Sequence, residues 1–361
     1  MPMADRYKSK QAAISQQELN GILRAHEAYV ARRGGLRANL AHQKLDGLIL
    51  ANCNLEEADF SGASLVGAKL YGSNLYRATL FCADLRGCDL RMAKLTRANL
   101  RGASFKGATL AYAVLDKADL RAGTMMIVGT KEISLIDRNR SGQNPTGVDF
   151  SNCSLKGASF GDATLDGANF SGAMLQGASF KNATLTNAVF KNAVLTGVHL
   201  AELHVPPEAL AESIRDILPQ AMAKCDDLKS KIEAHQQWII TQGKEGCPAV
   251  LDGEDLRPMH EFFTGRRLSG LSARHVVGIG LDFSESQLQA AKFEGADLRG
   301  ANFSRADLRG ASFKGAKLAH ANFEGADLGA LEMANGTKLL PDLAGAELMD
   351  QQLHNAIRDQ G

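Results

Sequence analysis

Side chains of the kinds that carry catalysis are present in this chain but scattered along its 361 residues. The nine histidines and six cysteines show no spacing typical of a zinc site, and no C-x-x-C pair occurs. The nucleophile motif G-x-S-x-G, the phosphate-binding motif G-x-x-x-x-G-K and the zinc motif H-E-x-x-H are all absent from the sequence. We therefore expect no catalytic residues, no metal and no cofactor, and we interpret the chain as a non-enzymatic protein.

Two histidines occupy equivalent places in a long internal repeat. His26 and His235 each lie within an apolar pattern at helical spacing, and the two patterns match at one constant offset. We expect each histidine on the core-facing side of a helix, where it hydrogen-bonds to the residues that follow the helix. A catalytic or metal-binding role is the less favoured interpretation.

Basic residues are concentrated in the first third of the chain. Residues 69–106 hold eight Lys or Arg and two Asp, which gives this window a net charge of +6. The candidate partner-binding surface comprises Arg77, Arg86, Arg91, Arg97, Arg101, Lys106, Lys117 and Arg121. Aromatic residues lie nearby at Tyr71, Tyr76 and Phe81. Such a surface could bind an acidic protein or nucleic acid, although a solvated face explains the same charges.

Two irregular segments, 123–147 and 257–279, are a further candidate because insertions that leave a rigid scaffold commonly carry binding residues. The apolar or basic candidates for loop contacts are Met125, Met126, Ile127, Phe262, Phe263, Arg266 and Arg267. Packing of each segment on its own scaffold explains these residues equally well.

The element that must position these side chains is a five-residue repeat. From Leu40 to Leu120 every fifth residue is Leu or Phe, and a small residue, usually Ala, lies two positions before each of them. A period of five fits neither an α-helix nor a simple strand. It fits a coil with four sides of five residues each, in which the Leu or Phe and the small residue point inward. Repeats of this kind bury a core only by stacking on their neighbours, so we expect a solenoid.

Residues twenty apart in such a solenoid lie on the same face of consecutive coils. This rule predicts three basic or aromatic columns. The first holds Arg77, Arg97 and Lys117, the second holds Phe81, Arg101 and Arg121, and the third holds Arg86 and Lys106.

The repeat resembles the pentapeptide-repeat family, whose members form right-handed quadrilateral β-helices. The resemblance covers residues 36–122, 146–202 and 279–330. It implies an all-β solenoid and supplies the hand of the coil, which the period alone does not. Some family members resemble duplex DNA in shape and charge and engage DNA gyrase. That mimicry requires an acidic rod, whereas this chain has a net charge of +1 and a basic first block.

The order of the patterns predicts two related modules, each preceded by a capping helix. Ser15 and Glu18 have the spacing of a capping box at the start of the first helix. The expected domains are an N-terminal capping helix in 1–38, a solenoid in 39–205 with the insertion 123–147, a helical connector or cap in 206–248, and a second solenoid in 249–361 with the insertion 257–279 and a C-terminal cap. An interruption that recurs in both halves also suggests an internal duplication.

The cysteines and the apolar segments indicate a cellular environment. Cys53, Cys88 and Cys153 occupy the small-residue position of the repeat, so we expect buried free thiols in a reducing compartment. The first ten residues are polar, and no stretch approaches the roughly 20 apolar residues of a membrane span. We therefore expect a cytoplasmic protein with no membrane insertion.

The favoured hypothesis for function is a scaffold or adaptor that binds another protein through its solenoid faces or its insertions. One alternative is a DNA-mimic protein that binds a topoisomerase such as gyrase. Another is a protein that binds nucleic acid directly through its basic face. The partner's identity does not follow from the residues, and a homodimer stays open.

Overall fold

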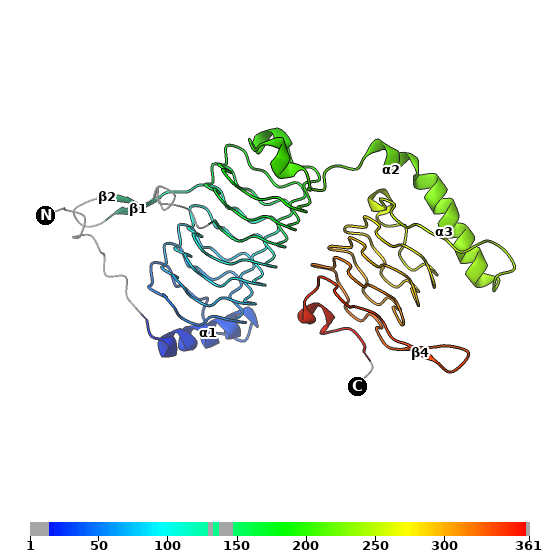
Figure 1. Ribbon diagram of the computed structural model, residues 1–361. Coiled ribbons are helices and arrows are strands. Elements are labelled where there is room, and N and C mark those ends of the chain that lie inside the picture. The colour runs from blue at the N-terminus through cyan, green and yellow to red at the C-terminus, as the bar shows by residue number, and fades with distance from the viewer. Residues whose placement is uncertain (1–13, 129–132, 137–146, 359–361) are drawn as a thin grey trace. The chain divides into compact units, whose positions relative to one another are not determined.

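The computed structural model describes residues 14–128, 133–136 and 147–358. They belong to two compact units, Met1–Asp216 and Ile217–Gly361. Each unit is a stack of short coils (Figure 1). No helix in this described part of the chain is both long and apolar enough to cross a bilayer.

Consecutive coils are joined by parallel backbone pairing between residues twenty apart. Asn39 pairs with Asp59, and Asp59 pairs in turn with Thr79. Each side of a coil contributes a single bridge rather than a long strand, because the chain turns every five residues. The main-chain N–H of Leu40 donates to the carbonyl of Asp59 at 2.7 Å, which is typical of the whole ladder.

The core of each unit is a column of inward Leu and Phe side chains lined with Ala. Leu40, Leu45 and Leu50 are fully buried, as is almost every Leu or Phe at this position. Aromatic rings twenty residues apart, on successive coils, stack face to face. The ring of Phe170 lies 5.1 Å from those of both Phe150 and Phe190. The regular period thus produces a continuous dry core.

A helix packs against the start of each core. In the first unit, α1 (Gln16–Val30) begins with a capping box in which Ser15 and Glu18 satisfy each other's backbone N–H groups. Its Leu19 is buried in the first core. In the second unit, α2 (Pro219–Ala223) leads into α3 (Cys225–Ile240), whose Leu228 and Ile232 are buried in the second core. The short 3₁₀ helices are η3 (Leu200–Glu202), η4 (Pro207–Leu210), η5 (Arg257–Met259) and η6 (Asp350–Leu353).

The segment after Leu120 leaves the first solenoid and returns to it in register. Thr109 pairs with Asp149, forty residues on instead of twenty, so the excursion adds the length of one coil. The excursion contains strands β1 (Met125–Val128) and β2 (Ile133–Ile136), which pair antiparallel. The solenoid is therefore continuous on either side of this insertion.

The expected insertion at 257–279 is wrong, because most of this segment is regular coil. Phe263 and Leu268 are fully buried inward residues of the second core. Asp255 pairs with Val277, 22 residues on, so only two residues are added near η5. Ala273 and Gly278 occupy inward positions where the pattern would hold Leu or Phe, which made the coil hard to recognise.

The second unit has a hairpin elsewhere, which the sequence pattern did not reveal. Strands β3 (Leu331–Glu332) and β4 (Lys338–Leu339) pair antiparallel after the regular coils. Ser312 then pairs with Asp342, thirty residues on, so the hairpin adds ten residues. Ten is a multiple of the five-residue period. Leu343 and Leu348 therefore lie at the positions expected for an uninterrupted repeat, and the sequence pattern does not indicate the hairpin.

Candidate partner-binding surface

Three of the predicted surface arginines are held by an aspartate two residues earlier. Arg86 contacts both carboxylate oxygens of Asp84 at 2.8 Å. Arg91 binds Asp89 in the same way, and the hydrogen bond from Arg91 lowers the pKa of Asp89 below its ordinary value. The tripeptide Asp-Leu-Arg forms this fork at six places, whose arginines are Arg86, Arg91, Arg121, Arg257, Arg299 and Arg309. The tripeptide was visible in the sequence and could have predicted these pairs.

The aromatic residues near the basic surface support guanidinium groups. Arg101 lies over the ring of Phe81 at 5.3 Å and is 3.7 Å from Asp119. Arg77 lies over Tyr76 at 5.6 Å. Because these rings are half-buried, they act as platforms for the arginines rather than as an exposed stacking surface.

The first predicted column is exposed and only weakly neutralised. We call Arg77, Arg97 and Lys117 the basic column. The main-chain N–H of Arg77 donates to the main-chain carbonyl of Thr96 at 3.1 Å. The main-chain N–H of Arg97 donates to the main-chain carbonyl of Asp116 at 3.0 Å. These bonds stack the three corners on successive coils. Arg77 has one long ion pair, 3.8 Å to Glu57. Within the residues that the structure describes, neither Arg97 nor Lys117 has an ion pair or a side-chain hydrogen bond.

The backbone of the basic column is one that favours glycine. The φ angles are 56° at Arg77, 59° at Arg97 and 59° at Lys117. At the same corner, later coils of this unit hold Gly157, Gly177 and Gly197. A residue with a Cβ atom costs about 1 kcal/mol in this left-handed conformation. Three cations are thus kept at a corner where glycine would be less strained.

Lys106 lies on the coil next to Arg86, as the third predicted column requires, because the main-chain N–H of Gly87 donates to the Lys106 carbonyl at 3.0 Å. The Lys106 side chain is exposed. Arg121 is exposed but belongs to a fork with Asp119. The residues of the predicted columns therefore stack on successive coils, and aspartates neutralise some of their charges and not others.

The start of the first insertion lies back along one corner of its own solenoid. A Cβ atom added to Gly102 would collide with the carbonyl of Gly123, and one added to Gly62 would lie 3.1 Å from Sδ of Met125. Met125 is accordingly buried. It is therefore a packing residue and not a free contact. Met126 and Ile127 lie in β1, and their side chains fall outside the described part of the structure.

The candidate contacts of the second segment mostly hold α3 against its coil. Phe263 is fully buried, so it cannot reach a partner. The guanidinium of Arg266 lies 3.8 Å from the ring centre of Phe262 and donates to Gln236 on α3. Arg267 alone of the four is exposed. The expectation that these residues form a loop surface is wrong for Phe262, Phe263 and Arg266, because the segment is coil.

The equivalent histidines have the structural role that their position indicated. The N–H of Ala38 donates to Nδ1 of His26 at 3.0 Å, and that of Ala249 donates to Nδ1 of His235 at 3.1 Å. Burial lowers the pKa of both histidines, which keeps them neutral acceptors. The described residues contain no group of His, Cys, Asp and Glu that could hold a metal ion.

The thiols in the repeat are poor nucleophiles. Burial raises the pKa of Cys88 to about 12 and the pKa of Cys153 well above its ordinary value. Both side chains are buried in the small-residue position. Cys53, in the same position, is only half-buried. A buried thiol with a raised pKa packs as a small apolar side chain and does not react readily.

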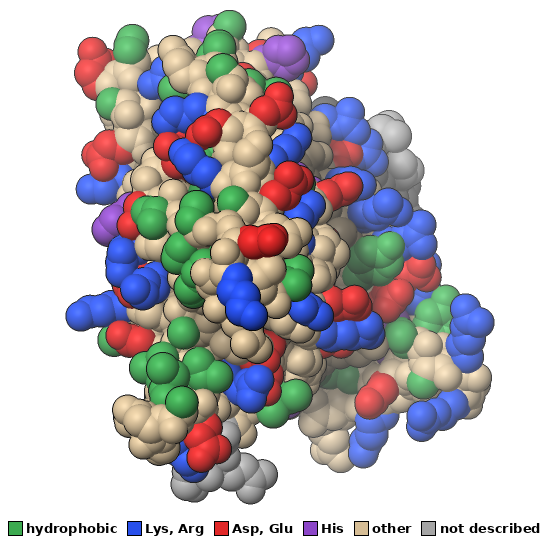
Figure 2. Space-filling view, turned by 90° about the vertical axis from the view of Figure 1, so that its right-hand side faces the viewer, with side chains coloured by type: hydrophobic (Ala, Val, Ile, Leu, Met, Phe, Trp, Pro, Cys, Tyr) green, Lys and Arg blue, Asp and Glu red, His purple; other side chains and the backbone are tan. Residues whose placement is uncertain are grey.

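Acidic and basic side chains are interspersed on the face of the molecule shown in Figure 2, rather than segregated into areas of one sign. Such a mixed face gives no long-range field of one sign. A short run of weakly neutralised cations, such as the basic column, is therefore a local feature.

Comparisons with known proteins identify the repeat. A family model described as pentapeptide repeats matches eight copies, which together cover just over half of the chain. The matched residues are 37–70, 58–97, 88–122, 146–182, 175–202 and 291–329. None of the curated proteins compared matches the chain.

Several solved structures are similar to the chain at low identity. HetL from the cyanobacterium Nostoc sp. strain PCC 7120, a pentapeptide-repeat protein involved in heterocyst differentiation regulation, is 23% identical, with 84% of this chain and 85% of HetL covered and a TM-score of 0.27. Full-length QnrB1, a plasmid-mediated fluoroquinolone resistance protein, is 22% identical, with 52% and 90% covered and a TM-score of 0.18. Rfr23 from the cyanobacterium Cyanothece 51142 is 19% identical, with 55% and 95% covered and a TM-score of 0.13.

Proposed function

Because the chain belongs to the pentapeptide-repeat family and is a right-handed β-helix, we propose that it is a non-enzymatic scaffold that binds an acidic protein surface along the basic column. The observation that carries this proposal is the contrast among its cations. Arg86, Arg91 and Arg121 are each bound to their own aspartate, whereas Arg97 and Lys117 point to solvent without a carboxylate partner among the described residues.

The spacing of the column suggests the form of the acidic surface. Coils of a β-helix are about 4.8 Å apart, so the three cations repeat at this distance along the solenoid. Side chains three or four positions apart on an α-helix recur at about 5–6 Å. A helix with Glu or Asp at such positions therefore matches the column, whereas an isolated acidic residue would engage only one cation.

The test uses a helical peptide with a row of glutamates at i, i+4 and i+8, and the same peptide with glutamines as its neutral control. We expect the acidic peptide to bind with an affinity that falls as salt rises. The double variant Arg97→Glu/Lys117→Glu should weaken binding by about tenfold, since two attractive contacts become repulsive. The charge-matched control Lys181→Glu/Lys314→Glu changes exposed lysines outside the column and should bind as the unmodified chain does.

Two results would contradict this proposal. Equal loss of binding in both double variants would mean that net charge alone is sensed. Duplex DNA bound as tightly as the acidic peptide, and lost in the same column variant, would favour direct nucleic-acid binding instead. The DNA-mimic alternative requires an acidic rod, so we expect no inhibition of gyrase supercoiling by this protein.

We also infer that the two units are related modules, each started by a capping helix. Both starting helices bury a leucine in the adjacent core, and both use a histidine to accept from the first coil. A second aromatic residue stacks on each histidine, Tyr29 at 5.9 Å and Trp238 at 5.8 Å. We propose domains 1–38, 39–216, 217–248 and 249–361. The first solenoid extends beyond the expected residue 205, because Ile214 still pairs with Val194. The buried free thiols support a reducing, cytoplasmic location.

A further inference from the structure

The backbone ladder of the first unit stops on three sides of its last coil, where residues 179, 184 and 189 form no bridge to residues twenty positions on. In regular coils a single residue closes each rung with two hydrogen bonds. Thr184, for example, donates to the carbonyl of Ala163 at 3.0 Å and accepts from the N–H of Leu165 at 2.8 Å. One coil later the equivalent groups are Ala183 C=O and Leu185 N–H. Neither group, nor the N–H of Asn187, has a hydrogen-bond partner among the described residues.

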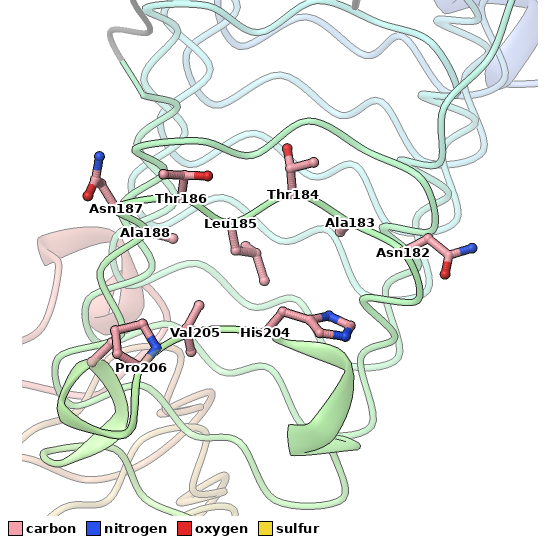
Figure 3. Close-up of a pocket in the computed structure, with 11 residues that line it drawn as sticks. Asn182, Ala183, Thr184, Leu185, Thr186, Asn187, Ala188, His204, Val205 and Pro206 are labelled. Atoms are coloured by element: carbon pink, nitrogen blue, oxygen red, sulfur yellow. The ribbon is translucent and has the colours of Figure 1, made fainter.

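The chain passes this side without closing it. Residues His204, Val205 and Pro206 are twenty positions after residues 184–186 and would form the next rung in a regular coil. None of their backbone groups bonds to the open rung. A pocket of about 540 Å³ lies here instead, lined by Asn182–Ala188, His204–Pro206 and Ala209. Figure 3 shows Leu185 pointing into the space between the two segments.

The ladder is also open on the two flanking sides, because the N–H groups of Phe180 and Phe190 have no hydrogen-bond partner among the described residues. The opposite side of the same coil is closed, since Leu195 N–H donates to the carbonyl of Ile214 at 2.7 Å. At the end of the second unit, Ile357 donates to Ala326 and accepts from Leu328, both at 2.8 Å. The fold therefore closes its final rungs where the chain returns in register. It leaves three sides of this coil open, and the pocket lies at the middle one, Ala183–Asn187.

We propose that this open rung binds an extended peptide segment of a partner protein that carries a small residue two positions before Leu or Phe. Its backbone would supply an N–H to Ala183 C=O and carbonyls to the N–H groups of Leu185 and Asn187. The side-chain preference follows from the surface beneath it. Ala183 and Leu185 are 6% and 5% exposed, and comparable inward pairs in this solenoid are covered by another Ala-x-Leu or Ala-x-Phe rung. Backbone bonds supply affinity and inward side chains supply selectivity in this mode of strand addition.

The volume and polarity of the site fit this ligand. A pocket of about 540 Å³ lies within the usual range for sites that enclose a small ligand. Thr184, Thr186 and Asn187 point outward and are exposed, so they leave room for the polar side chains of an added strand. This surface is distinct from the basic column, and its proposal does not depend on the acidic partner.

Amide hydrogen exchange tests whether the rung is open. Leu165 N–H donates to Thr184 at 2.8 Å and Gly167 N–H donates to Thr186 at 2.7 Å, and these amides are matched controls one coil earlier. We expect Leu185 and Asn187 to exchange much faster than Leu165 and Gly167. Equal protection of both pairs would overturn the open rung. Protection that rises with protein concentration would assign the site to a second copy of the chain and would overturn the peptide proposal.

Binding is tested with the capped peptide acetyl-Ala-Thr-Leu-Thr-amide, which copies one rung. We expect saturable NMR shifts of the Leu185 and Asn187 amides at peptide concentrations up to about 1 mM. The Leu328 amide, whose rung is already closed, should not shift. Replacing the amide of the first threonine by an ester removes the N–H meant for Ala183 and should weaken binding roughly 2- to 10-fold. An ester at the leucine, whose N–H faces away from the rung, should have little effect.

A variant of the protein provides the reciprocal test. Ala209 lines the pocket and is half-buried, so Ala209→Trp should fill the space and abolish the peptide-induced shifts. An unchanged melting temperature would show that this variant is folded. Absence of saturable shifts in the unmodified chain, equal affinity of the two ester peptides, or full binding by folded Ala209→Trp would each overturn the proposal.

Discussion

At the scale of single residues, the inward side chains and the outward charges follow different rules. An inward Phe such as Phe170 contacts the same residue type ten and twenty positions away, so its environment is set by the repeat. An outward Arg is set by its own neighbours. Arg91 is tied to Asp89, two residues earlier. The residue two positions before Arg97 is instead the inward Leu95, and Arg97 has no carboxylate partner among the described residues. The inward packing therefore depends on the repeat, and the pairing of the outward charges depends on the local sequence.

Phe170→Ala should be strongly destabilising. Its ring is fully buried between Phe150 and Phe190, and the neighbouring coils cannot close the cavity without losing their backbone bonds. We expect a loss of about 3–5 kcal/mol in the free energy of unfolding, measured by urea denaturation. Phe170→Leu is the matched control, because Leu fills this position in other coils, and it should cost less than about 1.5 kcal/mol. Similar losses for both variants would contradict the stacked column.

At the scale of elements, small residues let the first insertion lie on the solenoid. Gly102 has a φ of 66° and faces the carbonyl of Gly123, and Cys82 Sγ donates to that same carbonyl at 3.6 Å. The insertion is therefore held at its base by a corner without bulky side chains. The two starting helices are held differently, through one buried histidine each.

Gly102→Ala and Gly87→Ala separate backbone strain from contact with the insertion. Both glycines have nearly the same φ, 66° and 65°, so both variants incur about 1 kcal/mol of strain. A Cβ atom at Gly87 meets nothing within 4 Å, whereas one at Gly102 collides with Gly123. We expect Gly102→Ala to lower the melting temperature further and to speed exchange of the Met125 amide. Identical behaviour of the two variants would mean that the insertion is not seated on this corner.

Acid should loosen both starting helices. Burial lowers the folded-state pKa of His26 and His235 below 6.5, so protonation favours the undocked state. The stabilisation is present above about pH 6.5 and is lost as pH falls through the lowered pKa. Hydrogen-exchange protection of the Ala38 and Ala249 amides should therefore decrease between pH 7.5 and 5.5.

His26→Gln is the control for this pH dependence, because glutamine offers a non-titrating acceptor. In this variant the pH dependence should vanish at Ala38 and remain at Ala249. A pH dependence that persists at Ala38 would show that another group is responsible, and Arg37 and Glu56 are the charged residues that act on His26.

At the scale of the whole molecule, the chain has two separate hydrophobic cores, one in each compact unit. In a solenoid each coil is stabilised mainly by its immediate neighbours. Each unit also has its own starting helix, and its last coils are followed by 3₁₀ helices, η3 and η4 in the first and η6 in the second. The two units therefore have the parts that independent folding requires.

We expect fragments 1–216 and 217–361 to fold separately. Each fragment should melt cooperatively in calorimetry, within a few degrees of a transition of the full chain. Phe170→Ala in the full chain should shift the transition of the first unit and leave that of the second in place. A single transition that shifts as a whole would show that the two cores unfold together.

The amino-acid sequence by itself determined the coil, its inward residues, the capping box and the stacking of Arg77, Arg97 and Lys117. These features depend on a period of five and on contacts between coils that are identical in kind, so local spacing is sufficient. The tertiary structure alone decided that residues 263–279 are coil, that a hairpin interrupts the second unit, and that Phe262 and Arg266 support α3. It also revealed the open rung at Leu185. These features depend on where the chain leaves and rejoins its solenoid. The hairpin adds ten residues, a multiple of the period, so the pattern keeps its phase across it. In residues 263–279, Ala273 and Gly278 replace the inward Leu or Phe by which the coil could be recognised.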